Sequence, residues 1–324
     1  MPMEATIDIR ITEADLAEAL RTDVMTGLSG PRKWLPPKWF YDARGSKLFE
    51  AITDLPEYYP TRTERALLHA CAQEIAVGAS DATELIELGS GSSEKTGLLL
   101  RSFSAHGSLR SYVPLDVSES ALRDAVGWIN AEFPRIEVHG LVSDFTNGLD
   151  WLPRRGRRIV ALLGGTLGNL VPAERAEFFG RLHNVLEPGE QLLLGVGLVT
   201  DPAVMVPAYD DAAGVTAEFN RNILHVLNNR LGANFEPSRF AHVAVWDPGN
   251  RWIEMRLEAT ADMTVTVADL DLMLEFAAGE QMRTEISAKF RLADFHAELA
   301  AAGLPAQRSW TDPAERFAVV LAGR

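Results

Sequence analysis

The stretch ELIELGSGSSEKTG, residues 84–97, decides the fold class that the sequence predicts. It begins with a short apolar strand, and Gly89-Ser90-Gly91 then turns the chain sharply into a helix. Glycines in such a turn let a ligand approach the backbone, and the start of a helix offers unpaired N–H donors. The dinucleotide fingerprint GxGxxG would need a third glycine at position 94, where Glu94 stands. A carboxylate there is unfavourable for a pyrophosphate but compatible with a ligand that carries an amine, although the glycines alone also fit a plain turn.

Between Thr63 and Val199, strand and helix patterns alternate, which is typical of a parallel α/β sheet. We expect helices at 65–77, 95–103 and 119–132, the last capped by Ser118, and a further helix that starts at Pro172. Near the C-terminus the patterns predict a helix at 292–302 and a hairpin of strands 306–310 and 317–322. The expected strands of the parallel part lie at 84–88, 111–115, 137–141, 158–163 and 190–198.

Acidic residues follow two further strands of the predicted sheet. Asp116 closes the second strand, at the spacing where a carboxylate usually meets ribose hydroxyls. Asp144 and Phe145 follow the third strand, where an acid and an aromatic ring typically hold an adenine through its amine and by stacking. Each acid alone is more often an N-cap or turn residue, but these strand ends meet at the carboxyl edge of one sheet. We therefore predict an S-adenosylmethionine site in an α/β, Rossmann-like class I methyltransferase sheet with the strand order 3-2-1-4-5-7-6.

After Val199 the pattern changes to that of an inserted α+β region. A helical pattern runs from Asp201 to about Leu231, and antiparallel strand patterns follow at 242–246, 252–259, 263–267, 270–276 and 281–290. We expect an S-adenosylmethionine-binding domain of residues 63–199 plus 289–324, and a substrate-binding domain of residues 12–62 plus 200–288. The active site is expected in a cleft between them, at the carboxyl edge of the sheet.

The composition narrows the classes of partner and the cellular address. The net charge of −14 argues against a nucleic acid and against an anionic membrane surface, because both need a basic binding surface. The single cysteine, Cys71, fits a reducing compartment, and the sequence begins without an apolar signal segment. The histidines lack metal-ligand spacings. We expect a cytoplasmic, monomeric protein that uses no metal.

Five long strings in the chain carry a specific resemblance: LPPKWFYDARGSKLFEAITDLPEYYPTRTE, ELGSGSSEKT, LGGTLGNLVP, AYDDAAGVTAEFNRNIL and FAAGEQMRTEISAKF. With them the chain resembles the L-histidine Nα-methyltransferase family of ergothioneine biosynthesis, whose members make hercynine from free histidine. The resemblance extends from about Leu35 to the C-terminus. Gly165 and Ala288 are slight departures, since relatives carry Ser and Cys at these positions.

The resemblance implies two sets of site residues. The residues that would contact S-adenosylmethionine are Tyr41, Gly89, Lys95, Asp116, Asp144 and Phe145. The residues that would line the pocket for free L-histidine are Tyr58, Gly164, Asn169, Tyr209, Met255, Glu285, Ile286 and Ser287. In this pocket Asn169 and Tyr209 would hold the α-carboxylate and amine, and Glu285 and Ser287 would hold the imidazole. Tyr58 and Asn169 are the candidate catalytic residues.

The residues around Glu285 have the chemistry that an imidazole requires. Glu285 and Ser287 are two apart on a predicted strand and so share one face, with Ile286 on the other. A carboxylate and a hydroxyl on one face can accept a hydrogen bond from one ring nitrogen and bind the other. Without the family resemblance, a solvent-facing polar strand edge explains the same pattern equally well.

Asn169 and Tyr58 each have a simpler interpretation. The Asn169 amide can orient an acceptor amine without protonating it, but it can equally cap the helix that starts at Pro172. Tyr58 and Tyr59 precede Pro60 and are expected to be extended. One ring is expected in the core and the other in the pocket, where ring faces attract a cationic product. The resemblance selects Tyr58 for the pocket.

Methyl transfer itself needs little covalent help, because the sulfonium is a strong electrophile and requires only a neutral amine aligned behind the methyl group. The resemblance implies three successive methylations. Two other interpretations remain open from the sequence: a methyltransferase for another free amino acid, such as tryptophan or tyrosine, and a non-catalytic sensor that binds S-adenosylmethionine. Glu94 disfavours a dehydrogenase.

Overall fold

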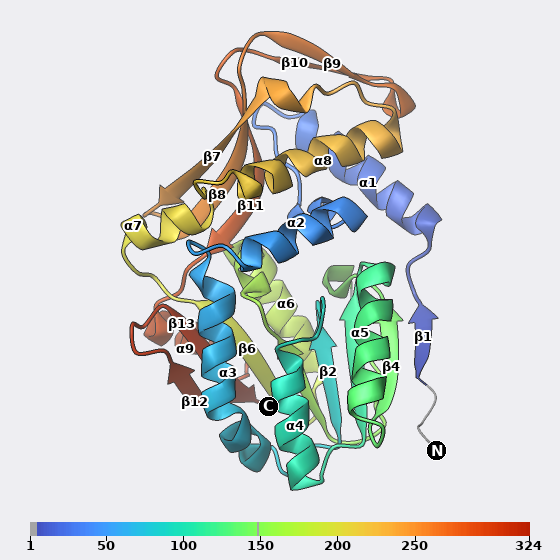
Figure 1. Ribbon diagram of the computed structural model, residues 1–324, viewed down its shortest axis with the longest axis vertical. Coiled ribbons are helices and arrows are strands. Elements are labelled where there is room, and N and C mark those ends of the chain that lie inside the picture. Colours follow the sequence, from blue (N-terminus) through green and yellow to red (C-terminus); the bar gives the residue numbers. More distant parts are fainter. Residues whose placement is uncertain (1–4, 148) are drawn as a thin grey trace. The chain divides into compact units, whose positions relative to one another are not determined.

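A computed structural model describes residues 5–147 and 149–324 (Figure 1). The chain divides into two compact units. Unit 1 comprises the residues up to Ile11, Pro60–Val199 and Ala288–Arg324, and unit 2 comprises Thr12–Tyr59 and Thr200–Ser287.

The sheet of unit 1 has the strand order β1-β4-β3-β2-β5-β6-β13-β12. From β1 to β6 in this order neighbouring strands are parallel, whereas β13 is antiparallel to β6 and to β12. Apart from the edge strand β1, which the sequence patterns did not predict, this is the predicted order 3-2-1-4-5-7-6, and the fold class is confirmed. The strands are β1 (Thr6–Ile9), β2 (Glu84–Leu88), β3 (Ser111–Asp116), β4 (Glu137–Val142), β5 (Arg158–Leu162), β6 (Gln191–Gly197), β12 (Ala306–Thr311) and β13 (Phe317–Gly323).

Helices cover both faces of this sheet. The apolar faces of α3 (Tyr59–Gly78), α4 (Thr96–His106) and α5 (Glu119–Glu132) pack on one face, in front of the sheet in Figure 1. Helix α6 (Pro172–Val185) lies behind the sheet in this view, and it contacts α9 (Leu292–Ala301) through two phenylalanine rings 6.3 Å apart. Because both faces are covered, β2 and β5 are buried along their whole length, as the apolar run after Arg158 predicts for β5.

The predicted start of α3 was wrong. The helix begins at Tyr59 and not at Arg65, so Tyr59 is helical and not extended, while Tyr58 precedes the helix. Pro60 occupies the first turn of α3, where its missing N–H removes no intrahelical hydrogen bond. The polar residues that follow it carry no apolar period, which is why the pattern placed the start too late, at Arg65. By contrast, α5 has the predicted bounds, and the Ser118 hydroxyl accepts the capping hydrogen bond from the backbone of Ala121.

Unit 2 contains two small sheets, with the orders β11-β8-β7 and β10-β9, and the helices that pack with them. Its strands are β7 (Phe240–Asp247), β8 (Trp252–Ala259), β9 (Met263–Val267), β10 (Leu272–Phe276) and β11 (Gln281–Ala288). Its helices are α1 (Glu13–Leu28), α2 (Ala43–Thr53), α7 (Pro202–Met205) and α8 (Val215–Leu231). Short 3-10 turns are η1 (Pro37–Phe40), η4 (Val206–Ala208), η5 (Pro237–Arg239) and η6 (Ala268–Leu270).

The helical pattern predicted from Asp201 to Leu231 is interrupted between η4 and α8. The Asp211 carboxylate accepts hydrogen bonds from the backbone N–H groups of Val215 (3.0 Å) and Thr216 (2.7 Å), and so caps the first turn of α8. Gly214, the residue before α8, has a left-handed φ of 75°, which a continuous helix does not allow. The break leaves Tyr209 in a loop.

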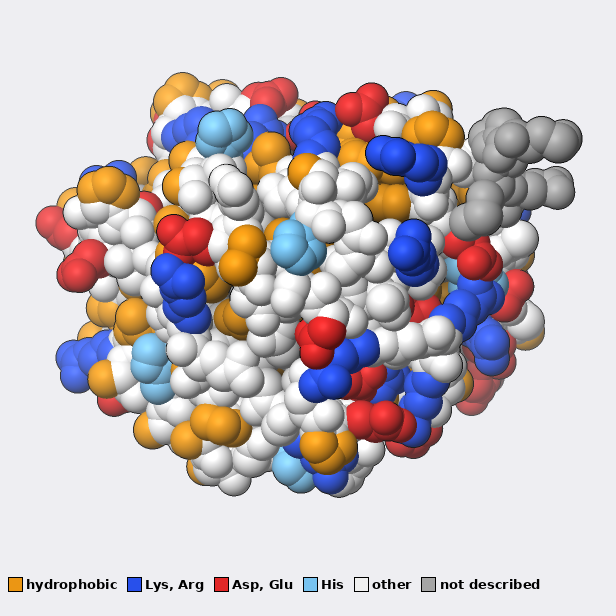
Figure 2. All heavy atoms as spheres, turned by 90° about the horizontal axis from the view of Figure 1, so that it is seen from below, with side chains coloured by type: hydrophobic (Ala, Val, Ile, Leu, Met, Phe, Trp, Pro, Cys, Tyr) orange, Lys and Arg blue, Asp and Glu red, His pale blue; other side chains and the backbone are white. Residues whose placement is uncertain are grey.

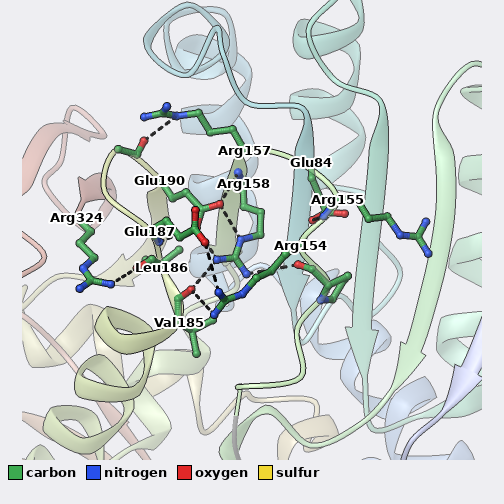
Figure 3. Close-up of polar contacts among 12 residues, drawn as sticks. Glu84, Arg154, Arg155, Arg157, Arg158, Val185, Leu186, Glu187, Glu190 and Arg324 are labelled. Carbon is green, nitrogen blue, oxygen red and sulfur yellow. Dashed lines mark hydrogen bonds and ion pairs between the residues drawn. The ribbon is translucent and has the colours of Figure 1, made fainter.

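A buried ion pair joins β5 to β6 at the amino edge of the sheet (Figure 3). Arg158 and Glu190 have side chains that are 0% and 6% exposed. The guanidinium donates to both carboxylate oxygens, at 2.8 and 2.5 Å, and also to the carbonyl of Val185 at the end of α6. Burial raises the pKa of Glu190, but the hydrogen bonds from Arg158 and from the backbone of Glu187 outweigh it and lower the pKa below its usual value.

The neighbouring arginines also have acidic partners, but their pairs are exposed. Arg154 lies 3.4 Å from Glu187, and the two side chains are 50% and 64% exposed. Figure 2 looks at this end of the protein, and on this face basic and acidic side chains lie next to one another. Such exposed pairs contribute little to stability, whereas the buried pair of Arg158 and Glu190 depends on both of its partners.

Replacing Arg158 with Met should lower the free energy of unfolding by about 3–5 kcal/mol, because it leaves the Glu190 carboxylate buried without its cation. Chemical denaturation at neutral pH measures the change. Arg154→Met is the matched control, and it should cost less than about 1 kcal/mol. Equal losses in the two variants would contradict the importance assigned to the buried pair.

Candidate functional site

The turn after β2 exposes bare backbone beside an aromatic ring. Gly89 and Gly91 have φ angles of 67° and 51°, in the left-handed region that favours glycine. A Cβ atom on Gly89 would lie 3.6 Å from the ring of Phe145, and one on Gly91 would meet no other atom within 4 Å. The structure therefore brings Phe145, which begins the turn η2 (Phe145–Asn147), next to the glycine turn.

The acids at the ends of β3 and β4 hold the turns in which they lie. Asp116 accepts hydrogen bonds from the backbone N–H groups of Gly91 (2.8 Å) and Ser118 (2.9 Å), and burial raises its pKa. One oxygen of Asp144 accepts from the backbone N–H and the hydroxyl of Thr146, at 2.8 and 2.5 Å. Both acids thus have the turn role that an isolated acid would have. A carboxylate offers about four lone-pair sites, so this role is compatible with a second one toward a ligand.

Lys95 is tied to a buried carboxylate that the sequence analysis did not select. Its ammonium forms an ion pair with Glu64, a residue of α3 that is 0% exposed. The same carboxylate accepts the backbone N–H of Gly164, with its oxygens at 2.8 and 3.0 Å. A Cβ atom on Gly195 would lie 2.0 Å from Glu64, so the carboxylate fills the space that this glycine leaves. The surrounding sequence, TRTER, has the composition of an exposed helix and offers no signal for this role.

A second buried carboxylate belongs to β2, the strand that precedes the Gly89–Gly91 turn. Glu87, in β2, is 3% exposed and accepts hydrogen bonds from the hydroxyls of Thr96 and Tyr112, and the Tyr112 hydroxyl is 2.9 Å from that of Ser93. Burial raises the pKa of Glu87 to about 7, although these hydrogen bonds and the charge of Lys95 lower it. This network connects β2 and β3 to the first residues of α4.

Asn169 does not cap α6, so the simpler interpretation of this residue was wrong. The N-cap is Val171, whose backbone N–H donates to the side chain of Glu174 at 2.9 Å. Asn169 ends the 3-10 turn η3 (Thr166–Asn169), which follows Gly164 and Gly165 with φ angles of 81° and 72°. The Glu64 carboxylate therefore contacts both the residue before α4 and the loop that leads to Asn169.

In unit 2 the structure brings together Tyr58, Tyr209 and Ser287. The hydroxyls of Tyr209 and Ser287 are 2.7 Å apart, and the rings of Tyr58 and Tyr209 meet edge to face, with centroids 6.2 Å apart. Burial and the negative charge of Glu285 raise the pKa of Tyr209 against the hydrogen bond to Ser287, which lowers it. Glu285 is half-buried on β11, and Ile286 is buried.

The other two candidates of unit 2 are also in its core region. The Tyr41 ring packs against Phe49 and Phe219, with centroids 5.6 and 5.5 Å away. Met255 is buried in β8. The candidate residues in unit 1 are Gly89, Lys95, Asp116, Asp144, Phe145, Gly164 and Asn169. Those in unit 2 are Tyr41, Tyr58, Tyr209, Met255, Glu285, Ile286 and Ser287.

The described residues include neither a metal-binding cluster nor a membrane-spanning helix. Among them, no group of three or more His, Cys, Asp or Glu side chains is arranged to hold a metal ion. In the same part of the chain, every helix is too short or too polar to cross a lipid bilayer.

Comparison with known proteins gives one consistent result. The sequence model of a family described as histidine-specific, S-adenosylmethionine-dependent methyltransferases matches residues 20–324. The chain is 53% identical over 308 residues to the histidine N-alpha-methyltransferase of Mycolicibacterium smegmatis, covering 95% of this chain and 96% of that protein. It is 50% identical to the protein of the same name from Mycobacterium tuberculosis, covering 94% and 95%. Ergothioneine biosynthesis protein 1 of Neurospora crassa is 34% identical, over 70% of this chain and 26% of its own length.

The buried Glu87 predicts a pH dependence of stability. Its pKa is about 7 in the folded chain against 4.5 in the unfolded one, so between these values the folded state binds more protons. The free energy of unfolding should therefore fall as pH rises from 4.5 to 7, by at most about 1.4 kcal/mol per pH unit from this group.

The measurement is urea denaturation at several pH values, comparing the wild type with Glu87→Gln. The free energy of unfolding of Glu87→Gln, minus that of the wild type, should increase between pH 4.5 and pH 7 and should level off above pH 7. Glu94→Gln, at a side chain 65% exposed, is the control and should change nothing across the window. A constant difference between Glu87→Gln and the wild type would contradict the buried, proton-binding carboxylate.

Proposed function

Because the chain belongs to the family of histidine-specific, S-adenosylmethionine-dependent methyltransferases, we propose that it methylates the α-amino nitrogen of free L-histidine. The observation that carries the proposal is the 53% identity to a histidine N-alpha-methyltransferase over nearly the full length of both proteins. Three transfers to one nitrogen would give hercynine, the trimethylated betaine of histidine. The similarity to ergothioneine biosynthesis protein 1 supports a place at the first step of ergothioneine formation. The single cysteine, Cys71, supports action in the reducing cytoplasm.

In this proposal unit 1 binds the methyl donor. The bare backbone of the Gly89–Gly91 turn accommodates the methionine moiety, and Lys95 contacts the donor from the end of the turn. Asp116 accepts from the ribose hydroxyls, and Asp144 accepts from the adenine amine while Phe145 packs on the ring. The hydrogen bonds that Asp116 and Asp144 already make support these roles, because they fix each carboxylate before the ligand arrives. The family resemblance assigns Tyr41 to the donor as well.

Unit 2 supplies most of the proposed histidine pocket. Glu285 accepts from one imidazole N–H, and Ser287 binds the other ring nitrogen. Tyr209, held by Ser287, binds the carboxylate and the amine, a role that the family resemblance also gives to Asn169. The Tyr58 ring faces the growing ammonium, an attraction of about 0.5–2 kcal/mol. The pocket is completed by Gly164, Met255 and Ile286.

The reaction needs alignment more than covalent catalysis. The neutral amine attacks the methyl carbon, the carbon–sulfur bond breaks with its electron pair left on sulfur, and the amine proton leaves through water near Tyr58 or Asn169. Holding the two reactants in line supplies on the order of 7–11 kcal/mol. The rigid hydrogen bonds of Glu64, Asp116 and Tyr209 support such a mechanism.

Incubation of the purified protein with S-adenosylmethionine and each of a panel of free amino acids tests the acceptor. Histidine should be consumed, and mass spectrometry should find a product with three added methyl groups. Methylation of tryptophan or tyrosine in preference to histidine would replace the proposed substrate with that amino acid. Binding of S-adenosylmethionine without any transfer would indicate a sensor.

Glu285→Gln should raise the KM for histidine by roughly ten- to a hundredfold, because a hydrogen bond to a charged group contributes about 1.5–3 kcal/mol. The KM for S-adenosylmethionine should stay unchanged. Initial-rate kinetics with each substrate varied in turn give both values. Glu275→Gln, an exposed position on β10, is the matched control. Unaltered histidine kinetics in Glu285→Gln would remove the imidazole assignment.

A further inference from the structure

A buried hydrogen-bond network of unit 2 lies next to Tyr209. It consists of Asn220 from α8, His242 from β7 and Thr284 from β11. Asn220 and Thr284 are 0% exposed, and the His242 side chain is 2% exposed. Burying so many polar groups is costly unless each is paired, which indicates that their arrangement is specific.

The partners of Asn220 determine the orientation of its amide. Its nitrogen lies 3.0 Å from the carbonyl of Arg256, which can only accept, and 2.8 Å from Nδ1 of His242. Its oxygen lies 2.6 Å from the hydroxyl of Thr284, which is also 3.0 Å from the Met255 carbonyl. A flipped amide would place its oxygen against the carbonyl oxygen of Arg256, so the observed orientation is the one that gives this carbonyl a donor.

This orientation also determines the tautomer of His242. An amide nitrogen only donates, so Nδ1 of His242 must be the unprotonated acceptor and the ring proton must be on Nε2. Nε2 lies 2.7 Å from the backbone carbonyl of Tyr209 and therefore donates to it. A second proton, on Nδ1, would face the donor of Asn220.

The surrounding charges agree with a neutral ring. Burial lowers the pKa of His242, and the positive charge of Arg221 lowers it further. The hydrogen bond to Tyr209 and the charges of Asp210 and Asp211 act in the opposite direction but do not reverse the shift.

Tyr209 is thereby held at both ends. His242 binds its backbone carbonyl, and Ser287 binds its hydroxyl. The residue itself ends η4, where its backbone N–H donates to the carbonyl of Val206 at 2.9 Å, and it is followed by a loop that leads to α8. Without the contact from His242, this loop would lose a buried link to the sheet that also carries Ser287 and Met255.

We propose that His242 is a positioning residue for the acceptor pocket: its Nε2–H fixes the Tyr209 backbone, and Asn220 and Thr284 fix His242 in the tautomer that can donate. This inference rests on the proposed function, in which Tyr209 binds the acceptor amino acid. Its consequence is that the geometry of Tyr209 depends on residues that do not touch the substrate.

Two substitutions of His242 separate the two ring nitrogens. The amide nitrogen of Gln can take the place of Nε2 and keep the hydrogen bond to Tyr209, while losing the contact with Asn220. Asn places its amide near Nδ1, where it keeps the contact with Asn220 but cannot reach Tyr209. Each variant loses one hydrogen bond of the ring. If His242 only stabilised the fold, the two variants should therefore have similar KM values for histidine.

Initial-rate kinetics of the full-length chain should show the asymmetry. His242→Asn should raise the KM for histidine about tenfold, and His242→Gln should leave it within about twofold of the wild type. The KM for S-adenosylmethionine should be unchanged in both. Equal KM values for histidine in the two variants, or a larger rise in His242→Gln, would overturn the proposal.

Two further measurements allow the role of His242 to be decided if His242→Asn does not fold or if histidine is not the substrate. If His242→Asn does not fold, Thr284→Val is tested in its place: by removing the hydroxyl that donates to the Asn220 oxygen it should weaken the support of His242 and raise the KM for histidine, and an unchanged value would overturn the proposal. The wild type tests the proposed function separately. If it methylates another free amino acid, the histidine assignment is wrong, and the same comparison of His242 variants with that acceptor still decides the role of His242.

Discussion

The buried carboxylate of Glu64 is the constraint on which the carboxyl edge of unit 1 depends. A charge with no exposure must be compensated by partners in good geometry, or the fold loses several kcal/mol. Here the partners are Lys95, before α4, and the backbone N–H of Gly164, after β5. Gly195 must remain without a side chain to leave room for it. One carboxylate from α3 thus sets the positions of two loops that carry candidate cofactor and acceptor residues.

In unit 2 the buried polar groups that fix a candidate residue are neutral. Asn220, His242 and Thr284 satisfy one another and leave a single donor directed at Tyr209, whose hydroxyl is bound by Ser287. In each unit a side chain proposed to touch a ligand is oriented by a buried neighbour, Lys95 by Glu64 and Tyr209 by His242 and Ser287. This is the arrangement that methyl transfer requires, since the donor is already reactive and alignment of the acceptor supplies most of the rate enhancement.

Much of the fold and the choice of candidate residues could be predicted because the signals are local. The strand 84–88 and the helix 119–132 have the predicted bounds, and the alternation of strands and helices predicted the parallel sheet, whose strand order is the one expected of a class I methyltransferase. The glycine turn is confirmed by the positive φ angles of Gly89 and Gly91. Long strings of the sequence indicated the family, which the comparisons confirmed. The roles of individual site residues stay predictions.

The sequence by itself determined the class of fold, the family and the side chains with suitable chemistry. Each of these can be predicted from residues that are close together in the sequence. Tertiary structure alone decided which partners orient them. Glu64 meets Lys95 from 31 positions away and Gly164 from 100, and Thr284 meets Asn220 from 64. The edge strand β1 pairs with β4 across 133 positions, from Thr6 to His139. The periodicity of apolar residues predicts which face of a helix or strand is buried. It does not predict which polar group from a distant part of the chain will be buried against that face.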